Sequence, residues 1–312
     1  METLIEEPIV EKNRQTSKVL QEVAKLSSAS QSIKNFTQIP IMEKIIRKML
    51  ANEKLLFVLP AFPAKSPNLD KVSGTTPDLG EVLALKKLNH MCEQISQCYE
   101  PGAEVLICSD GRVFSDIVRV SDALIDDYSF GIKEIIRDFN LHHLNTFDME
   151  DAYGDVGGEK LRALLDQDFA QTREQVRHLV QFDADYCGLF NGVHRFMVED
   201  FIGLPENLGL SRTQVAKQAK QSTYELLRRS DAWSILLRQR FPEALRFSIH
   251  AYPLQHEKFG ISLLPASDRV ATPWHNVAVS NGQGYELMHR SVAMAMGARK
   301  LFYKEKYAYY EI

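Results

Sequence analysis

The chain has 312 residues with 45% hydrophobic content, which is enough to bury a large core. Its 37 basic and 41 acidic residues give a net charge of -4 without a block of like charges, so neither nucleic acid nor a membrane surface is expected as a partner. No apolar run approaches the roughly 18 residues of a membrane span. The charged N-terminal stretch lacks the apolar centre of a secretory signal, so we expect a cytoplasmic protein.

The first 50 residues are expected to form an N-terminal helical segment packed on the core. Up to about Lys34, the apolar side chains of Val19, Val23 and Leu26 are spaced as one helical stripe, and residues 41–50 continue as an amphipathic helix.

The remaining chain, residues 51–312, is expected to be one α/β catalytic domain. Short apolar runs at 54–60 and 104–108 predict buried parallel strands, with a helix at 79–99 between them. Long helical stretches predict a helical insertion near 160–241. Runs at 247–252, 260–264 and 276–279 predict further strands before a helix at 288–300. The expected fold is therefore a Rossmann-like, mostly parallel sheet flanked by helices, with additional helical segments and a C-terminal β-containing portion.

The four cysteines show no C-x-x-C spacing, so neither a redox pair nor a zinc ribbon is indicated. We expect reduced, mostly buried thiols at Cys92, Cys98, Cys108 and Cys187.

The segment 247–279 sets reactive side chains between short apolar runs, a pattern typical of strand ends and turns. Its candidate site residues are His250, Gln255, His256, Lys258 and His275. The histidines match no metal-ligand signature, so we expect no metal and assign them to proton transfer near neutral pH. Lys258 either pairs with the neighbouring Glu257 at the surface or supplies a cation to a phosphate.

Two further polar clusters follow the predicted strands at 54–60 and 104–108. Lys65, in the proline-stiffened loop 62–68, is a phosphate-binding cation, an amine that attacks a carbonyl, or a solvated loop lysine. Ser109, Asp110 and Arg112 combine a hydroxyl, a carboxylate and a forked cation suited to an oxyanion; the alternative is an ordinary Asp-Gly turn beside a surface arginine.

Arg195 lies in a basic stretch, 191–195, that we interpret as a loop. It either holds a carboxylate or phosphate or is a surface arginine beside a helix start. The aromatic ending at 302–310 is expected to serve packing or an interface.

The phosphate-binding loop of nucleotide hydrolases, the dinucleotide fingerprint and the serine-hydrolase elbow are all absent from the sequence. The reaction is therefore expected to need acid, base and cation groups and no cofactor.

Four segments together resemble the pyoverdine/dityrosine biosynthesis protein family, whose bacterial members include isocyanide (isonitrile) synthases. They are FPAKSPN with the following K-V-x-G-x-x-P-D-x-G-E, CSDGRVFSD, SIHAYPLQHEKFGISLLP and ATPWHNVAV, and the resemblance spans roughly Leu55 to Val279. It implies a cofactor-independent, carbon–carbon lyase-type enzyme that converts the α-amine of an aromatic amino acid to an isocyanide, with tyrosine favoured over tryptophan. Ribulose 5-phosphate would supply the carbon through an imine, phosphate loss and carbon–carbon cleavage.

The resemblance also implies roles for the candidate residues. Lys65, Arg112 and Lys258 would neutralise phosphate or carboxylate, and Arg195 is a further substrate-binding candidate. Asp110, His250 and His256 would move protons, whereas Ser109, Gln255 and His275 would orient substrates. Small-molecule substrates are the expected partners, with a downstream tailoring enzyme of the pathway as a candidate protein partner.

Three other functions remain open, the first two from the residues and the third from a fungal branch of the resemblance. One is a metal-assisted hydrolase or lyase that uses His250, His256 and His275. The second is a non-catalytic small-molecule binding protein on the same frame. The third is another condensation on an amino acid, such as N-formylation.

Overall fold

The computed structural model describes residues 3–28, 39–250, 256–266 and 271–312, with the backbone alone at 3–11. Its centre is a five-stranded, wholly parallel sheet in the order β3-β2-β1-β4-β5. The strands are β1 (Leu55–Pro60), β2 (Ala103–Cys108), β3 (Leu144–Phe147), β4 (Leu245–Ser248) and β5 (Lys258–Gly260). The order places β2 on one side of β1 and β4 on the other, so the chain changes direction across the sheet at β1.

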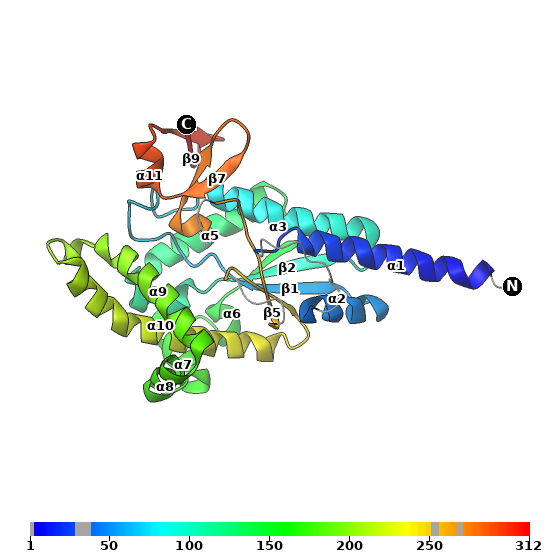
Figure 1. Ribbon diagram of the computed structural model, residues 1–312, viewed down its shortest axis with the longest axis horizontal. Coiled ribbons are helices and arrows are strands. Elements are labelled where there is room, and N and C mark those ends of the chain that lie inside the picture. The colour runs from blue at the N-terminus through cyan, green and yellow to red at the C-terminus, as the bar shows by residue number, and fades with distance from the viewer. Residues whose placement is uncertain (1–2, 29–38, 251–255, 267–270) are drawn as a thin grey trace.

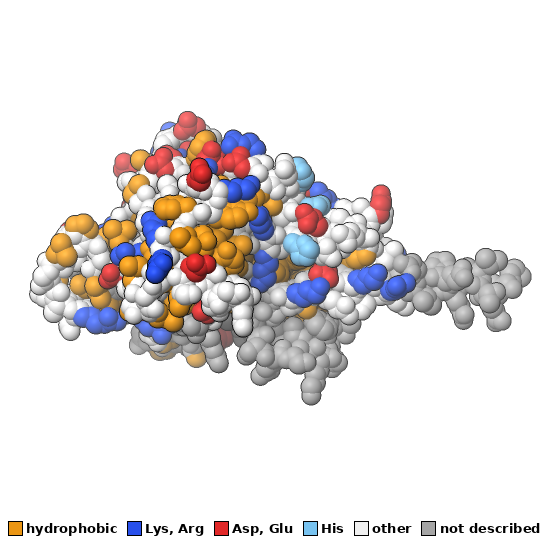
Figure 2. All heavy atoms as spheres, turned by 90° about the horizontal axis from the view of Figure 1, so that it is seen from above, with side chains coloured by type: hydrophobic (Ala, Val, Ile, Leu, Met, Phe, Trp, Pro, Cys, Tyr) orange, Lys and Arg blue, Asp and Glu red, His pale blue; other side chains and the backbone are white. Residues whose placement is uncertain are grey.

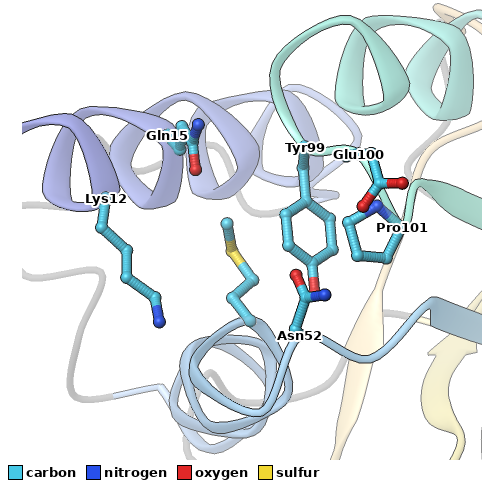
Figure 3. A pocket seen from close by; sticks show the side chains of 7 residues that line it. Lys12, Gln15, Asn52, Tyr99, Glu100 and Pro101 are labelled. Atoms are coloured by element: carbon cyan, nitrogen blue, oxygen red, sulfur yellow. The ribbon is translucent and has the colours of Figure 1, made fainter. Parts of the chain in front are cut away.

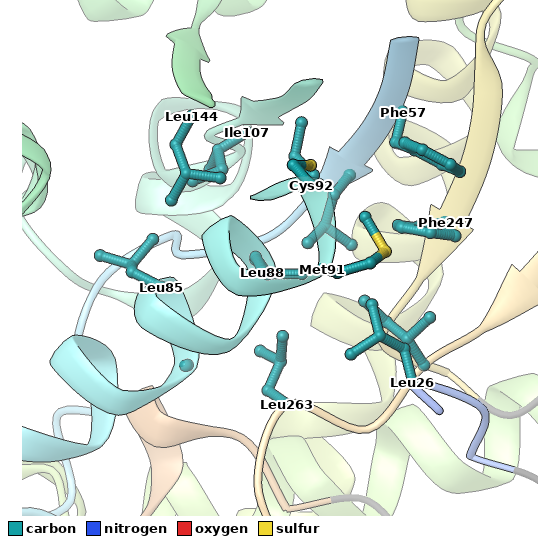
Figure 4. Close-up of a cluster of buried hydrophobic side chains, with 14 of the residues drawn as sticks. Leu26, Phe57, Leu85, Leu88, Met91, Cys92, Ile107, Leu144, Phe247 and Leu263 are labelled. Atoms are coloured by element: carbon teal, nitrogen blue, oxygen red, sulfur yellow. The ribbon is translucent and has the colours of Figure 1, made fainter. Parts of the chain in front are cut away.

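The first face of the sheet carries the larger core. Four helices supply it: α1 (Thr3–Ala24), α2 (Pro40–Leu50), α3 (Leu79–Cys98) and α5 (Asp122–Asp138). Figure 4 shows Leu88 and Met91 of α3 lying against Phe57, Ile107 and Phe247 of the strands. We call this side the α3 face. The predicted N-terminal stripe packs here, because Val19, Val23 and Leu26 are buried in the same core.

The second face packs against a long helix, α10 (Arg212–Arg240), and we call it the α10 face. Trp233 and Leu236 of α10 join Val58 and Cys108 in its core. Shorter helices complete this side of the fold: α4 (Gly111–Val118), α6 (Met149–Tyr153), α7 (Gly158–Phe169), α8 (Arg173–Phe182) and α9 (Ala184–Ile202). Helices α7 to α10 project together from the sheet in Figure 1.

The helical stretch predicted near 160–241 is present, but the loop predicted at 191–195 is wrong. Those residues lie inside α9. Asp183 caps the start of that helix, and Phe190, Val193, Met197 and Phe201 form one buried stripe at helical spacing. Burial of the stripe outweighs the turn preference of the Asn-Gly pair.

The C-terminal part forms a second, mixed sheet in the order β7-β6-β9-β8. Its elements are β6 (Val277–Ser280), β7 (Tyr285–Met288), α11 (Arg290–Ala295), β8 (Arg299–Tyr303) and β9 (Tyr307–Glu311), and Figure 1 places them beside α3. Tyr307 and Tyr310 are buried, which confirms packing for part of the aromatic ending, whereas Phe302 is exposed.

Two predicted elements near the C-terminus are shorter than expected. The run at 260–264 contributes only Gly260 to β5, because Ile261 turns away to bridge Ser27. The helix expected at 288–300 ends at Ala295. Gly297, with a φ of +83°, then turns the chain into β8.

None of the helices in the described part of the chain is both long and apolar enough to span a membrane. On the face drawn in Figure 2, acidic and basic side chains are interspersed around apolar areas.

Candidate active site

The site lies where the strand order reverses, between the carboxyl ends of β1 and β4. In open α/β sheets the loops that leave such neighbouring strands diverge and leave a crevice for ligands. Lys65 follows β1 and His250 follows β4. His275, from the short 3-10 helix Pro273–His275, is close enough to both to interact with them electrostatically.

The loop after β1 contacts two of the other segments that carry the family resemblance, 108–116 and 271–279. Its Lys65 Nζ donates to the carbonyl of Pro273 at 2.9 Å, and the Ser66 amide donates to the carbonyl of Trp274 at 2.8 Å. Ser109 Oγ donates to the carbonyl of Phe62 at 3.1 Å. Phe62 has a φ of +59°, and its ring packs 5.1 Å from that of Trp274.

Lys65 is fully enclosed and held by two carboxylates. Its Nζ lies 2.8 Å from Asp78 Oδ2 and 2.9 Å from Glu81 Oε1. Both acids occupy the start of α3, where Asp78 accepts from the Gly80 amide and Glu81 accepts from the Asp78 amide as a capping box. The same turn therefore starts the helix and positions the lysine.

Burial alone would lower the pKa of Lys65, but Asp78 and Glu81 outweigh it, and the net shift is upward. Burial raises the pKa of Asp78 to about 7, against the opposing effect of Lys65. Lys65 is therefore an ammonium ion at neutral pH and has no free electron pair with which to attack a carbonyl.

Asp110 is the most perturbed carboxyl group at the end of β2. Burial raises its pKa to about 7, and among the described residues its Oδ1 has no hydrogen-bonding partner. Tyr128, on α5, donates to Glu81 Oε1 at 3.0 Å and interacts electrostatically with Asp110. An aspartic acid in this state exchanges a proton at physiological pH.

A second buried ion pair lies beside the first. Lys71 Nζ is 2.8 Å from Asp200 Oδ1 on α9, and Ser66 Oγ donates to the same oxygen at 2.8 Å. The Phe196 ring of α9 lies 4.9 Å from Lys71 Nζ and 4.3 Å from the His275 ring. Helix α9 thus packs against both Lys71 and His275.

His275 is held in a neutral form. Burial and the charges of Lys71 and Lys65 lower its pKa well below the usual value. Its Nδ1 is 2.9 Å from Thr272 Oγ1, and its Nε2 is 3.7 Å from Asp200 Oδ2. The neutral ring can orient a substrate or accept a proton through Nε2.

The histidines of the 247–258 segment are also neutral near pH 7. Burial and Lys258 lower the pKa of His250 and of His256. The His250 residue is exposed to solvent. His256 Nδ1 accepts from the Lys258 amide at 3.0 Å.

Arg112 lies apart from this crevice, beyond β2 and β3. It is paired with Asp126 and, at 2.9 Å, with Glu150. Together with Ser109, Phe130 and Lys133 these side chains line a pocket of about 290 Å³. Arg112 would have to leave two carboxylates to bind an anion.

The remaining two candidates are not brought to the crevice by the described structure. Arg195 is exposed on α9. Gln255 lies outside the described residues. No group of three or more histidine, cysteine, aspartate or glutamate side chains is arranged to hold a metal ion in the described ranges.

Several site residues were given no role from the sequence. They are Lys71, Asp78 and Glu81, which stood in a motif quoted for the resemblance, and Tyr128 and Asp200, which were not singled out. The D-x-x-E spacing of Asp78 and Glu81 signals a helix start, and so could have singled out both acids. Nothing in the pattern around Tyr128 or Asp200 marks them.

A separate pocket of about 340 Å³ opens between α1, α2 and the end of α3 (Figure 3). It lies at the amino ends of the strands, because Leu55 and Ala103 begin β1 and β2 just beyond it. Tyr99 there donates to the carbonyl of Glu53. The pocket is at the opposite edge of the sheet from Lys65 and Asp110.

Comparison with known proteins identifies the family. Residues 45–300 match the model of the pyoverdine/dityrosine biosynthesis proteins. The chain belongs to this family. It is 41% identical over 259 residues to L-tryptophan isonitrile synthase AmbI2 of Fischerella ambigua, covering 83% of this chain and 78% of the relative. It is 38% identical to the L-tyrosine isonitrile synthase of Pseudomonas aeruginosa, covering 87% and 83%.

A solved structure agrees. The crystal structure of PvcA from Pseudomonas aeruginosa superimposes with a TM-score of 0.87 at 36% sequence identity, covering 96% of this chain and 99% of that one. The family and the α/β fold with its parallel sheet, both predicted from the sequence, are confirmed.

Proposed function

We propose that this protein is an isonitrile synthase that converts the α-amine of an aromatic L-amino acid to an isocyanide, with ribulose 5-phosphate as carbon donor and no cofactor. The observation that carries the proposal is the convergence of three resemblance-bearing segments, 62–81, 108–116 and 271–279, on one acid–base cluster around Lys65. Relatives that are named isonitrile synthases at 36–41% identity support it.

The reaction begins when the amine adds to the ketone of the sugar and water leaves, giving an imine. Successive proton transfers then expel phosphate and break both carbon–carbon bonds of the former carbonyl carbon, which releases its neighbours as a one-carbon and a three-carbon fragment and leaves that carbon alone on nitrogen. These steps need groups that change protonation near pH 7 beside a charge-stabilising environment.

The proposed roles follow from the protonation states. Asp110, with a pKa of about 7, gives and takes protons, and the neutral imidazoles of His250 and His256 accept them. Lys65 acts electrostatically, since its ammonium ion can stabilise developing negative charge. His275 orients substrate.

The other expected binding roles stay proposals. Ser109 and Arg112 would act from the loop after β2, with Arg195 and Gln255 as further contacts. We also retain tyrosine as the preferred substrate, a cytoplasmic location and a tailoring enzyme as downstream partner.

The test is mass spectrometry after incubation with ribulose 5-phosphate and an equimolar mixture of tyrosine and tryptophan. The expected product is one carbon heavier and two hydrogens lighter than tyrosine, and it forms only when both substrates are present. A product from tryptophan alone would reverse the preference, and no isocyanide from either amino acid would refute the function.

Matched variants test the site. Lys65→Ala and His256→Ala are expected to lose isocyanide formation. The exposed residues Lys54 and His90 provide the controls Lys54→Ala and His90→Ala, which should retain it. Near wild-type rates in both site variants would contradict the site assignment.

A further inference from the structure

Asp110 stands just before α4, at the position where an aspartate normally caps a helix. Such a carboxylate ordinarily accepts a hydrogen bond from a backbone amide of the first helical turn. The side chain of Asp110 makes no such bond, and its backbone, with φ of -105° and ψ of 14°, lies close to the sparsely populated bridge region. Starting the helix is therefore not what this side chain does.

The carboxyl group of Asp110 has no counter-ion in the described part of the chain. Its Oδ1 is enclosed and has no hydrogen-bonding partner there. Burial raises the pKa of Asp110 to about 7, and only its own backbone amide opposes this effect. A buried carboxylate without a partner is unfavourable, and a cationic ligand removes that penalty.

The groups that face Asp110 do not supply a positive charge to it. Tyr128 of α5 and Cys108 of β2 interact with it electrostatically, and burial raises the pKa of both, so both are neutral at pH 7. Tyr128 gives its hydroxyl proton to Glu81. The charge of Arg246 reaches Cys108 but does not contribute to the shift of Asp110.

Asp110 is held beside the loop that follows β1. On one side of it, Ser109 Oγ donates to the carbonyl of Phe62. On the other, Gly111 packs so closely against the carbonyl of Pro63 that a Cβ would lie 2.1 Å from its oxygen. Asp110 as a whole is partly exposed although its Oδ1 is enclosed, which places the carboxyl group just beneath the surface.

We propose that Asp110 binds the α-ammonium group of the amino-acid substrate and then removes its proton, so that the amine can add to the sugar ketone. An N–H bond breaks, the electron pair stays on nitrogen, and the proton joins the carboxylate to give a neutral acid. Burial favours this step, because it disfavours the charged carboxylate. The identity of the substrate rests on the proposed function, whereas ammonium binding rests on Asp110 itself.

A single carboxylate suits a primary ammonium ion, with which it forms a charge-assisted hydrogen bond. A metal ion requires several ligands at once. The described residues contain no group of three or more acidic, histidine or cysteine side chains that could provide them.

Calorimetric titration of the full chain with three ligands tests the proposal. They are tyrosine, tyramine, which keeps the ammonium group, and 3-(4-hydroxyphenyl)propionate, which lacks it. Asp110→Asn is expected to raise the Kd for tyrosine and tyramine about 10-fold or more, the scale of a lost hydrogen bond between charged groups. The propionate should bind the variant at least as well as wild type, because its carboxylate no longer meets an anion.

The pH dependence of binding separates ammonium recognition from a structural role. Tyrosine and tyramine should bind wild type up to about 10-fold more tightly at pH 8 than at pH 6, because only the ionised form of Asp110 attracts the ammonium ion. The propionate should not show this increase. Asp78, whose pKa is also about 7, is retained in Asp110→Asn, so the part of the trend that the variant loses belongs to Asp110.

Two neighbouring acids serve as comparisons. Asp127→Asn, at an exposed position on α5, is the matched control, and its Kd for tyrosine should stay within about twofold of wild type. Asp126 lines the pocket of about 290 Å³ and pairs with Arg112. If Asp126→Asn, and not Asp110→Asn, selectively weakened the two ammonium ligands, the proposal would be overturned.

Equal weakening of all three ligands in Asp110→Asn, or a wild-type Kd for tyrosine that is the same at pH 6 and pH 8, would also overturn it. Ammonium binding that depends on Asp110 without any isocyanide product would refute the proposed function and leave this binding role standing. Isocyanide formation by wild type, with unchanged tyrosine binding in Asp110→Asn, would refute the binding role alone.

Discussion

Lys65 and Asp78 form an ion pair of 2.8 Å in which the two side chains are only 1% and 6% exposed. Glu81 completes the group, so the cluster contains one cation and two acids. Such an arrangement is costly to disrupt, because removing the cation leaves acid groups buried without their counter-ion.

We expect Lys65→Met to lower the free energy of unfolding by about 3–5 kcal/mol. Lys54→Met removes a lysine that is equally close to a carboxylate, at 2.6 Å from Glu104, but is 53% exposed, and should cost at most about 1 kcal/mol. Urea unfolding at pH 7 measures both. If both variants lost the same free energy of unfolding, burial would not be what makes the Lys65 ion pair costly to disrupt.

Asp110 should make stability depend on pH. Its pKa is raised from 3.8 to about 7, so the folded state holds a proton that the unfolded state releases, and stability falls as pH rises from about 4 through about 7. Asp110→Asn removes this penalty. At pH 8 the variant should have a free energy of unfolding up to about 4 kcal/mol above that of wild type, and thermal unfolding should show a higher Tm. At pH 4 the two should differ little.

The same variant should abolish isocyanide formation, since an amide cannot exchange the proton. Asp127→Asn, on the exposed side of α5, serves as control for both measurements. A destabilised Asp110→Asn at pH 8 would show that the carboxylate is better accommodated than its burial indicates.

Gly111 permits a close approach between two loops of the site. A Cβ at this position would lie 2.1 Å from the carbonyl oxygen of Pro63 and 2.8 Å from Ile125. Gly111→Ala should therefore push the Lys65 loop away from α4, reducing both stability and activity. Gly188→Ala, in open space on α9, should be neutral or stabilising by up to about 1 kcal/mol, as thermal unfolding and product assays would show.

His275 should resist protonation. Because its pKa in the folded state is far below that of the unfolded chain, stability contributed by its neutral form is lost as pH falls below about 6.5. Nitrogen-15 NMR should find its ring neutral at pH 6, and His275→Gln should lose less stability than wild type between pH 7 and 5. A charged ring at pH 6 would contradict this.

The strands at 54–60 and 104–108 were predictable because both are short apolar runs buried on two faces. Because ligands bind at the carboxyl ends of the strands in such sheets, these two strands were enough to predict that Lys65 lies at the ligand-binding edge of the sheet. Strand β3, by contrast, was missed because only Leu144 of its four residues is buried.

The partners of the site residues were beyond sequence reasoning. Arg246 meets Lys258 only because β5 adds to the sheet beside β4, and β4 lies beside β1, which precedes it by some 190 residues. Likewise, Asp200 pairs with Lys71 only because residues 191–195 are helical, which extends α9 as far as the loop after β1. Long-range pairings of this kind depend on the assembled fold.

Helix α10 also contacts both α4 and strand β4, and so fixes their separation. Arg229 donates to the carbonyl of Val113 and is paired with Asp116, which fixes α4 just beyond Asp110. Five residues later, Ser234 holds Arg246. A residue inserted between Arg229 and Ser234 would rotate one of these two side chains by about 100° about the helix axis relative to the other. The spacing along this one helix therefore sets the distance between α4, which follows Asp110, and strand β4, so the two cannot be moved independently by changing its length.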